Sequence, residues 1–390
     1  MFRVGFDYRP AQMKNSRNRG IGRYTANLFR ALIAQCDEAQ IQLVPYGLPD
    51  EAWPPGNFRL EWRSAPLLKR PARLNWLLDR WSLPKRIRAD RIDLFHALDP
   101  VSIPIAKGCR TWATVHDAIP YIFWEETVRR TPWDFRLALN QAVKRLRLAD
   151  RVITISESSK RDLWGRLGIE QGRISVVYGG CDPHIKPVEP EAARIVLQSR
   201  YNVDSPFLFY VGGTDFRKNL GRLAAAFARL RRLGYQGKLV LAGETFLWDI
   251  PEVNGLKQVM DQEEISPHVL LPGFVPDRDL AAFYAACDLF VFPSQYEGFG
   301  LPVLEAMTCG AAIAAGKVSA IPEVCGDAAF YFDPDFSDSM VETIWEALRH
   351  PEEVERKRTA GLERAKSFAW DRAAREILAL YSHAAGESAR

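Results

Sequence analysis

Asp288-Leu-Phe-Val-Phe-Pro-Ser-Gln-Tyr-Glu-Gly-Phe-Gly-Leu-Pro-Val-Leu-Glu305 is the stretch of sequence that decides the fold. Its apolar start predicts a strand from Asp288 to Phe292, and the glycines that follow predict a loop. Pro302 suits the first turn of a helix, where its missing N–H costs no hydrogen bond, and Gly310 suits the left-handed residue past a helix end. A strand, a glycine loop and a helix from Leu301 to Cys309 form the repeating unit of a doubly wound α/β sheet.

The same alternation of strand and helix patterns extends outward in both directions. Short, continuously apolar runs are typical of buried parallel strands, and they recur on both sides of a proline-rich stretch at 182–190. The strands predicted from these runs are Phe2–Tyr8, Ile41–Gly47, Thr111–His116, Arg151–Ile155, Ile174–Tyr178, Phe207–Val211, Lys238–Ala242, Val269–Leu271, Asp288–Phe292 and Ala311–Ala314.

This pattern predicts an α/β protein with two Rossmann-like doubly wound domains, 1–185 and 186–367, that face a central cleft. We expect ligands in that cleft, because such sheets bind at the carboxyl ends of their strands. Residues 368–390 are predicted to form an amphipathic helix that packs back toward the N-terminal domain.

Composition excludes several classes of protein. The chain has 390 residues, 47% hydrophobic and 26% charged, so it is neither disordered nor fibrous, and its net charge of +4 is too small to require nucleic acid as a partner. The six cysteines form no CxxC pair, which argues against a zinc knuckle or a disulfide framework. The charged start and the lack of a long apolar run lead us to expect a cytoplasmic protein without a membrane-spanning segment.

The opening stretch also predicts an anion site. The N–H groups of Gly300 and Leu301 at the start of the helix point toward an anion, helped by the helix dipole. Glu297 lies on the loop and Glu305 on the helix, eight residues later, so both carboxylates can accept hydrogen bonds from hydroxyls beside that anion.

A second anion site is predicted after the first strand of the same half. Gly212 and Gly213 end that strand, and Arg217 and Lys218 follow at the head of a helix. A helix dipole disfavours cations at this position, and a bound anion resolves the conflict.

Four motifs together carry a resemblance to a known family. They are E-G-F-G-L-P-V-L-E (Glu297 to Glu305), V-G-G-T-D-F-R-K-N (Val211 to Asn219), L-P-G-F-V-P (Leu271 to Pro276) and G-I-G-R-Y (Gly20 to Tyr24). In this order they resemble the retaining glycosyltransferases of family 4, which have the GT-B fold. The resemblance implies an acceptor-binding N-terminal domain and a donor-binding C-terminal domain.

The resemblance also implies roles for individual residues. Glu297 would face the donor sugar, Glu305 would accept the ribose hydroxyls, and Arg217 and Lys218 would neutralise the diphosphate in place of a metal ion. Many members carry an arginine five residues before the lysine, where this chain has Gly213, so Arg217 would substitute for it from the position next to Lys218. The implied catalytic residues are Glu297, His116, Lys218 and Arg217, with no metal site. The implied donor-binding residues are Gly20, Gly22, Gly212, Gly213, Arg217, Lys218, Val275, Glu297, Gly298, Phe299, Gly300, Leu301 and Glu305.

In the N-terminal half, His116 ends a predicted strand, and the resemblance places it against the donor sugar. Gly20 and Gly22 precede a helix and would close over the diphosphate. Asp117 is open to three readings: it orients His116, contacts the acceptor together with Arg23, or caps a helix. His96 also ends a strand and is interpreted as structural.

The implied reaction moves a hexosyl group from a nucleotide diphosphate sugar, with GDP-mannose as the first choice, to a saccharide or lipid-linked saccharide in lipopolysaccharide or exopolysaccharide synthesis. UDP- and dTDP-sugars, a sugar epimerase or phosphorylase, and a non-catalytic nucleotide-sugar binding protein stay open as alternatives. A dinucleotide oxidoreductase is excluded, because Phe6–Pro10 replaces the GxGxxG turn after the first strand.

The N-terminal half also carries two stretches in which Arg and Lys alternate with Trp, which fit either peripheral docking on an anionic membrane or a solvated helix face. The cations and tryptophans of these stretches are Trp62, Arg63, Lys69, Arg70, Arg73, Trp76, Arg80, Trp81, Lys85, Arg86, Arg88, Arg91, Arg129, Arg130, Trp133, Arg136, Lys144, Arg145 and Arg147.

Overall fold

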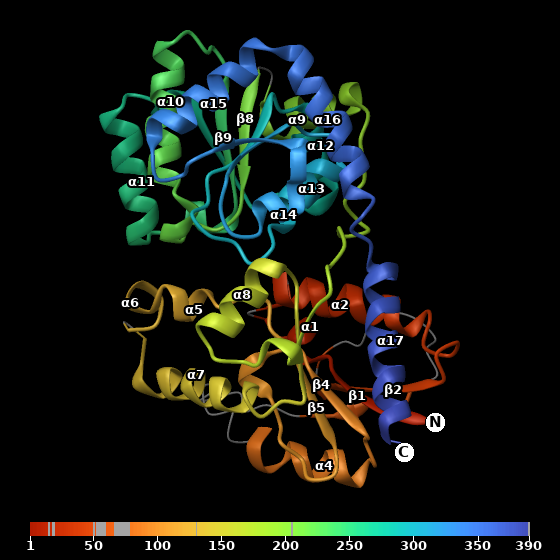
Figure 1. The fold of residues 1–390 in the computed structure, drawn as a ribbon. Helices are drawn as coiled ribbons and strands as arrows, with labels where there is room; N and C mark the ends of the chain where they lie inside the picture. Colours follow the sequence, from red (N-terminus) through yellow and green to blue (C-terminus); the bar gives the residue numbers. More distant parts are fainter. Residues whose placement is uncertain are drawn as a thin grey trace. The chain divides into compact units, whose positions relative to one another are not determined.

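Two parallel sheets organise the chain in the computed structural model, which describes all residues except 15, 18–19, 50, 52–59, 66–78, 130, 204–205 and 389–390. Lys69, Arg70, Arg73, Trp76 and Arg130 of the basic stretches lie outside the described residues. The chain divides into two compact units (Figure 1). Unit 1 comprises Met1–Gly180 with Ala369–Arg390, and unit 2 comprises Cys181–Phe368.

Unit 1 is built on a parallel sheet with the strand order β3-β2-β1-β4-β5-β6-β7. These strands are β1 (Phe2–Asp7), β2 (Ile41–Gly47), β3 (Arg63–Ser64), β4 (Leu94–Ala97), β5 (Arg110–Thr114), β6 (Arg151–Thr154) and β7 (Ile174–Val176). The helices of this unit are α1 (Arg9–Gln12), α2 (Gly20–Ile33), α4 (Leu83–Ala89), α5 (Ile119–Ile122), α6 (Trp124–Thr127), α7 (Trp133–Leu146), α8 (Glu157–Gly165) and α17 (Trp370–Ser388).

Unit 2 repeats the design with the strand order β10-β9-β8-β11-β12-β13. Its strands are β8 (Phe207–Val211), β9 (Lys238–Ala242), β10 (Val269–Gly273), β11 (Leu289–Phe292), β12 (Ile313–Gly316) and β13 (Ala329–Phe332). Its helices are α9 (Pro190–Tyr201), α10 (Leu220–Arg232), α11 (Pro251–Gln262), α12 (Asp277–Ala286), α13 (Leu301–Thr308), α14 (Ile321–Cys325), α15 (Ser337–Arg349) and α16 (Pro351–Ala365). Figure 1 shows α10 and α11 on one side of this sheet and α12 and α13 on the other.

The continuous apolar runs predicted from the sequence form the buried centre of each sheet. All residues of β11 are buried, and Phe209, Phe283 and Phe290 form an aromatic cluster in which the rings of Phe209 and Phe283 stack at 5.0 Å. Because apolar burial stabilises by about 25 cal/mol per Å², such clusters stabilise the centre of the sheet. The predicted doubly wound α/β fold with two Rossmann-like domains is confirmed.

Several details differ from the predictions. The units divide after Gly180, whereas the predicted boundary followed residue 185, and neither β3 nor β13 was predicted. The predicted strand Ala311–Ala314 lies two residues further along, as β12 from Ile313 to Gly316. The predicted C-terminal helix is present as α17, which packs against α2 within unit 1 (Figure 1).

Candidate functional site

The carboxyl edge of the unit 2 sheet carries the two predicted anion loops. One loop leads from β8 through a short 3-10 turn at Phe216–Lys218 into α10, and the other leads from β11 into α13. A backbone hydrogen bond of 2.8 Å from Gln295 to the Arg217 carbonyl joins the loops. The sequence motifs therefore lie side by side, although almost eighty residues separate them.

Two cations from the first loop flank one carboxylate from the second. Lys218 Nζ lies 2.6 Å from Glu297 Oε1, and an Arg217 guanidinium nitrogen lies 3.3 Å from Glu297 Oε2. Arg217 also pairs with Asp215 at 2.8 Å and donates to the Tyr296 carbonyl at 3.0 Å. The structure thus brings together three of the predicted catalytic residues. It also shows that Glu297 and Asp215 compensate the two cations, so their position near a helix start does not by itself require a bound anion.

The pKa of Glu297 reflects this pairing. Burial by itself raises the pKa of a carboxyl, but the charges of Lys218 and Arg217 and the hydrogen bond from Lys218 outweigh it, and the pKa lies below its ordinary value. Glu297 is therefore an anion at neutral pH. The apolar ring of Phe292, 5.2 Å from Lys218 Nζ, covers another side of the ammonium.

Glu305 lies on the first turns of α13, apart from this ion cluster. Its Oε2 accepts a hydrogen bond of 3.0 Å from the buried Tyr284 hydroxyl on α12. Burial and the neighbouring carboxylate raise the pKa of Tyr284 well above its ordinary value, so this phenol keeps its proton. Tyr284 thus fixes the orientation of the carboxylate that was predicted to accept ribose hydroxyls.

The glycines of these loops differ in what surrounds them. Gly300 has a φ of +99°, and a Cβ there would lie 2.7 Å from the Ile321 side chain, so glycine is required for the turn into α13. At Gly212 a Cβ would lie 2.6 Å from the Tyr210 hydroxyl, whereas at Gly213 the nearest atom is an Asp215 oxygen at 3.6 Å. Of these three glycines only Gly213 leaves open space above the loop.

The remaining donor-binding predictions of unit 2 lie on the same edge of the sheet. Gly212 donates to Ala242 at 3.0 Å and Gly243 donates to Gly273 at 2.8 Å, which ties together the ends of β8, β9 and β10. Val275 follows Gly273 and is buried. Gly298, Phe299 and Leu301 belong to the loop and first turn of α13, and Phe299 packs edge-on against Phe368 at 5.7 Å.

His116 follows β5 in unit 1 and lies at the carboxyl edge of that sheet. Its Nε2 is buried and has no hydrogen-bond partner among the described residues, and burial lowers the pKa of His116 to about 4. The imidazole is therefore neutral at neutral pH. The ring of Tyr24 on α2 meets it edge-on at 4.7 Å.

Asp117 accepts a hydrogen bond of 2.9 Å from the N–H of Ile119, the first residue of α5. Gly20 and Arg23 lie in the first turn of α2. A Cβ on Gly22 would lie 2.2 Å from the Ser16 carbonyl oxygen, so the packing of the preceding loop already requires a glycine there.

His96 is structural, as interpreted from the sequence. It is fully buried and hydrogen-bonds to Tyr381 at 2.6 Å and to Thr114 at 2.8 Å. Burial lowers the pKa of His96 to about 3, so the ring stays neutral.

The basic stretches of unit 1 are only partly a surface feature. Arg145 is buried and donates to the Ile103 carbonyl at 2.6 Å, and Trp62 packs against Phe29 at 5.5 Å. Trp81 and Trp133 are exposed. Arg145 and Trp62 thus pack within unit 1 and do not contribute to an exposed basic and aromatic surface.

Sequence reasoning missed the residues that hold the site loops in place. The buried Asn219 adopts a left-handed conformation with φ +58° and donates to the carbonyls of Pro293 and Pro334 at 3.2 and 2.7 Å. Ser319 accepts a hydrogen bond of 2.8 Å from the Glu297 N–H. Asn219 could have been found from the R-K-N triplet, because asparagine tolerates left-handed backbone. No local sequence pattern points to Ser319 or Tyr284.

Comparison with known proteins identifies similar chains and folds. Residues 194–364 match the family model described as glycosyl transferases group 1, and residues 18–185 match the model described as glycosyltransferase family 4. Sucrose-phosphate synthase from Thermosynechococcus elongatus has a similar fold over 98% of this chain and 99% of its own, with a TM-score of 0.77 at 20% identity.

Two Escherichia coli proteins are similar in sequence. O-antigen chain mannosyltransferase B is 32% identical over 236 residues, which span 60% of this chain and 60% of that protein. The serotype-specific mannosyltransferase WbdA is 27% identical over 277 residues, which span 70% of this chain but 34% of that protein. The matches therefore cover less than two thirds of either relative. Because the two family models match both halves of the chain in order, the chain belongs to the family 4 glycosyltransferases with the GT-B fold.

Proposed function

We propose that the chain is a retaining glycosyltransferase that moves a hexosyl group from a nucleotide diphosphate sugar to a saccharide or lipid-linked saccharide. The observation that carries the proposal is the buried cluster of Glu297, Lys218 and Arg217 beside the N-terminus of α13. It supplies two cations for a diphosphate and one carboxylate for sugar hydroxyls within a single site.

In this reaction the bond between the anomeric carbon and the diphosphate oxygen breaks while the acceptor oxygen bonds to the same carbon. Negative charge grows on the leaving diphosphate, and Lys218, Arg217 and the first N–H groups of α13 stabilise it, so we propose that no metal ion is required. The acceptor proton passes to the leaving phosphate on the same face of the sugar, which accounts for retention. Glu297 then binds sugar hydroxyls rather than acting as a nucleophile.

We propose GDP-mannose as the donor, because both Escherichia coli relatives are named mannosyltransferases. A thermal-shift panel of GDP, UDP, dTDP and ADP tests the base. GDP should raise the melting temperature far more than the other nucleotides, since stabilisation grows with the ratio of ligand concentration to Kd. A larger shift with another nucleotide would replace the proposed donor.

A transfer assay tests the reaction itself. With the donor selected by the panel and mannose-terminated lipid-linked saccharides as acceptors, mass spectrometry should detect one added hexose, and NMR of the product should show that the anomeric configuration is retained. Sugar turnover without any acceptor would instead favour an epimerase. Nucleotide binding without turnover on any acceptor offered would favour the non-catalytic binding protein.

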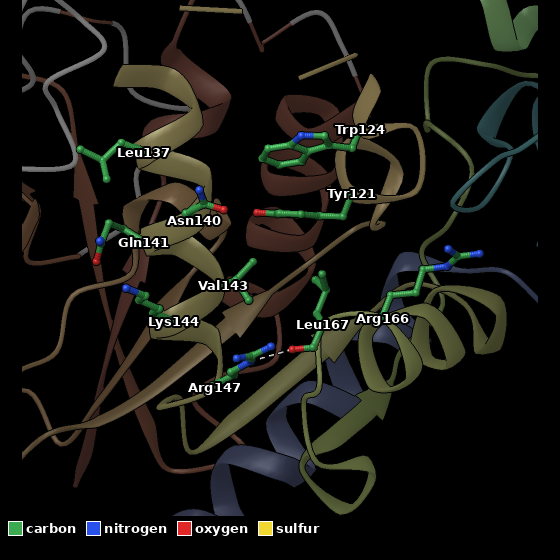
Figure 2. A pocket seen from close by; sticks show the side chains of 10 residues that line it. All are labelled: Tyr121, Trp124, Leu137, Asn140, Gln141, Val143, Lys144, Arg147, Arg166 and Leu167. Carbon is green, nitrogen blue, oxygen red and sulfur yellow. Dashed lines mark hydrogen bonds between the residues drawn. The ribbon is translucent and has the colours of Figure 1, made fainter. Parts of the chain in front are cut away.

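We further propose that the exposed cations of unit 1 dock an anionic membrane. A hollow of about 660 Å³ between α5, α6, α7 and the end of α8 is lined by Lys144, Arg147 and Arg166 (Figure 2). Figure 2 shows the stacked rings of Tyr121 and Trp124, 6.3 Å apart, at one end of it. Cations beside an aromatic pair suit phosphate-bearing headgroups. No helix among the described residues is long and apolar enough to cross a bilayer.

Co-sedimentation with vesicles tests this docking. Binding to phosphatidylcholine vesicles should require added phosphatidylglycerol. It should weaken in the double variant Lys144→Ala/Trp133→Ala. The variant Arg349→Ala, on α15, serves as the control. A near-surface cation contributes up to about 1 kcal/mol, and the paired change removes one cation and one exposed indole, so binding should weaken about fivefold. If binding does not depend on phosphatidylglycerol, the docking proposal is wrong and the basic stretches are a solvated helix face.

A further inference from the structure

Two aromatic side chains connect the C-terminal helix to His116 within unit 1. The Tyr24 ring on α2 meets the His116 ring edge-on, with centroids 4.7 Å apart and planes at 89°. The Trp370 ring at the first residue of α17 meets Tyr24 at 5.3 Å and 73°. Trp370, Tyr24 and His116 thus form a continuous row of rings.

The chain around Trp370 leaves the indole no room to move. A Cβ on Gly179 would lie 3.2 Å from the indole ring, and one on Gly180 would lie 2.9 Å from the indole Cδ1. Tyr24 is 3% exposed and Trp370 is 8% exposed. Close packing of this kind holds a side chain in one rotamer, because a shifted ring would overlap its neighbours.

We propose that Trp370 and Tyr24 are positioning residues that fix the plane of the His116 imidazole at the sugar-transfer site. This inference rests on the proposed function and on the family resemblance, which places His116 against the donor sugar. The row of rings leaves His116 Nε2 without a protein partner among the described residues. That nitrogen is then available to a substrate hydroxyl, which would supply its missing hydrogen bond.

NMR titration of the histidine side chains in the full chain tests the inference without relying on activity. Of the six histidines, the His116 signal is assigned by its loss in His116→Gln. The wild-type pKa should be about 4. In Trp370→Ala water reaches the imidazole, so the pKa of His116 should rise toward the ordinary value of about 6.5. Trp370→Phe should restore the low pKa.

Ile377→Ala is the matched control. Ile377 is fully buried on the same helix, about two turns after Trp370, so its truncation loosens α17 without removing the row of rings. It should lower the melting temperature as Trp370→Ala does and leave the His116 titration unchanged. If Trp370→Ala does not fold, Trp370→Leu takes its place. An unmoved titration in the Trp370 variant, or an equal shift in Ile377→Ala, would overturn the inference.

Kinetics separate this inference from the proposed function. In Trp370→Ala, kcat should fall at least about tenfold, with the donor KM changed less than twofold, because positioning acts on the transition state more than on donor binding. A shifted titration in a protein that transfers no sugar would leave the packing role intact and refute the proposed reaction. An unchanged kcat beside a shifted titration would refute the positioning role.

Discussion

Glu297 is compensated by Lys218 and Arg217 before any ligand is bound, and this pairing makes a pH-dependent contribution to stability. The folded pKa of Glu297 lies below its unfolded value, which is near 4.3. Its contribution is thus fully present above that unfolded value and is lost as the pH falls through the folded pKa.

We predict that Glu297→Gln lowers the free energy of unfolding at pH 7 by about 3 kcal/mol, since removing one partner leaves buried cations uncompensated. The difference from wild type should begin to shrink below the unfolded pKa of about 4.3, because the unfolded chain then takes up a proton that the paired carboxylate of the folded chain resists. Urea denaturation at a series of pH values measures this. A difference that stays constant down to pH 3 would show that the ion pairs are not its source.

Lys218→Ala should lower kcat at least about 100-fold, equivalent to about 2.7 kcal/mol of transition-state stabilisation. The reason is that Lys218 is proposed to oppose the charge that grows on the leaving diphosphate. Steady-state kinetics with saturating donor measure it. Arg229→Ala, on the exposed face of α10 in an ion pair with Asp338, is the control and should keep full activity.

For individual residues, the sequence predicted which side chains belong to the site better than it predicted which of them pair with one another. It brought Glu297, Lys218 and Arg217 into one site, but assigned the carboxylate to sugar and the cations to diphosphate, and so missed that they pair with one another. Ion pairs between residues almost eighty positions apart depend on the placement of two loops. Arg145 shows the same limit, because only the packing of α7 turns its side chain inward to the Ile103 carbonyl.

Glycine is required for different reasons in the two site loops, which lead from β11 into α13 and from β8 into α10. Substituting each glycine by alanine should therefore have different effects on stability. Gly300→Ala places a Cβ 2.7 Å from Ile321 at a positive φ, whereas Gly213→Ala meets only Asp215 at 3.6 Å. We predict that Gly300→Ala destabilises the protein by at least about 1 kcal/mol, and that Gly213→Ala stays within about 0.5 kcal/mol of wild type.

Nucleotide binding should show a different pattern in these two variants. Gly213→Ala fills the space that the proposed diphosphate needs, so its Kd for GDP should rise at least about tenfold while its stability is kept. Isothermal titration calorimetry beside thermal melting measures both quantities. Full affinity in Gly213→Ala would place the diphosphate elsewhere on the sheet edge.

The ends of helices were predictable where residues typical of a helix start and of a helix end both occur in the sequence. Pro302 and Gly310 mark the two ends of α13, and the structure has the helix from Leu301 to Thr308 with Gly310 at φ +74°. Ser156 caps α8 by accepting the Ser159 N–H at 3.0 Å. β13 was missed, because Ala329–Phe332 follows a short 3-10 turn and pairs with β12 through contacts that a local pattern does not reveal.

At the scale of the whole molecule, the proline-rich stretch 182–190 located the division between two sheets, since prolines cannot continue a helix or a central strand. In the structure the division follows Gly180, so the whole proline-rich stretch belongs to unit 2 and leads into α9, which begins at Pro190. The second crossing, after Phe368, carries no proline-rich marker, but it lies one residue from the start predicted for the amphipathic C-terminal segment at 368.

Because each unit has its own sheet and core, a nucleotide that binds unit 2 should stabilise the two units unequally. Hydrogen exchange of the full chain with and without GDP at about 100 times Kd measures this. Exchange of the core amides of β8 and β11 should slow by up to about 100-fold, equivalent to 2.7 kcal/mol. The core amides of β4 and β5 in unit 1 should change far less. Equal slowing in both sheets would mean that the units open together, and slowing in unit 1 alone would refute the assignment of nucleotide binding to unit 2.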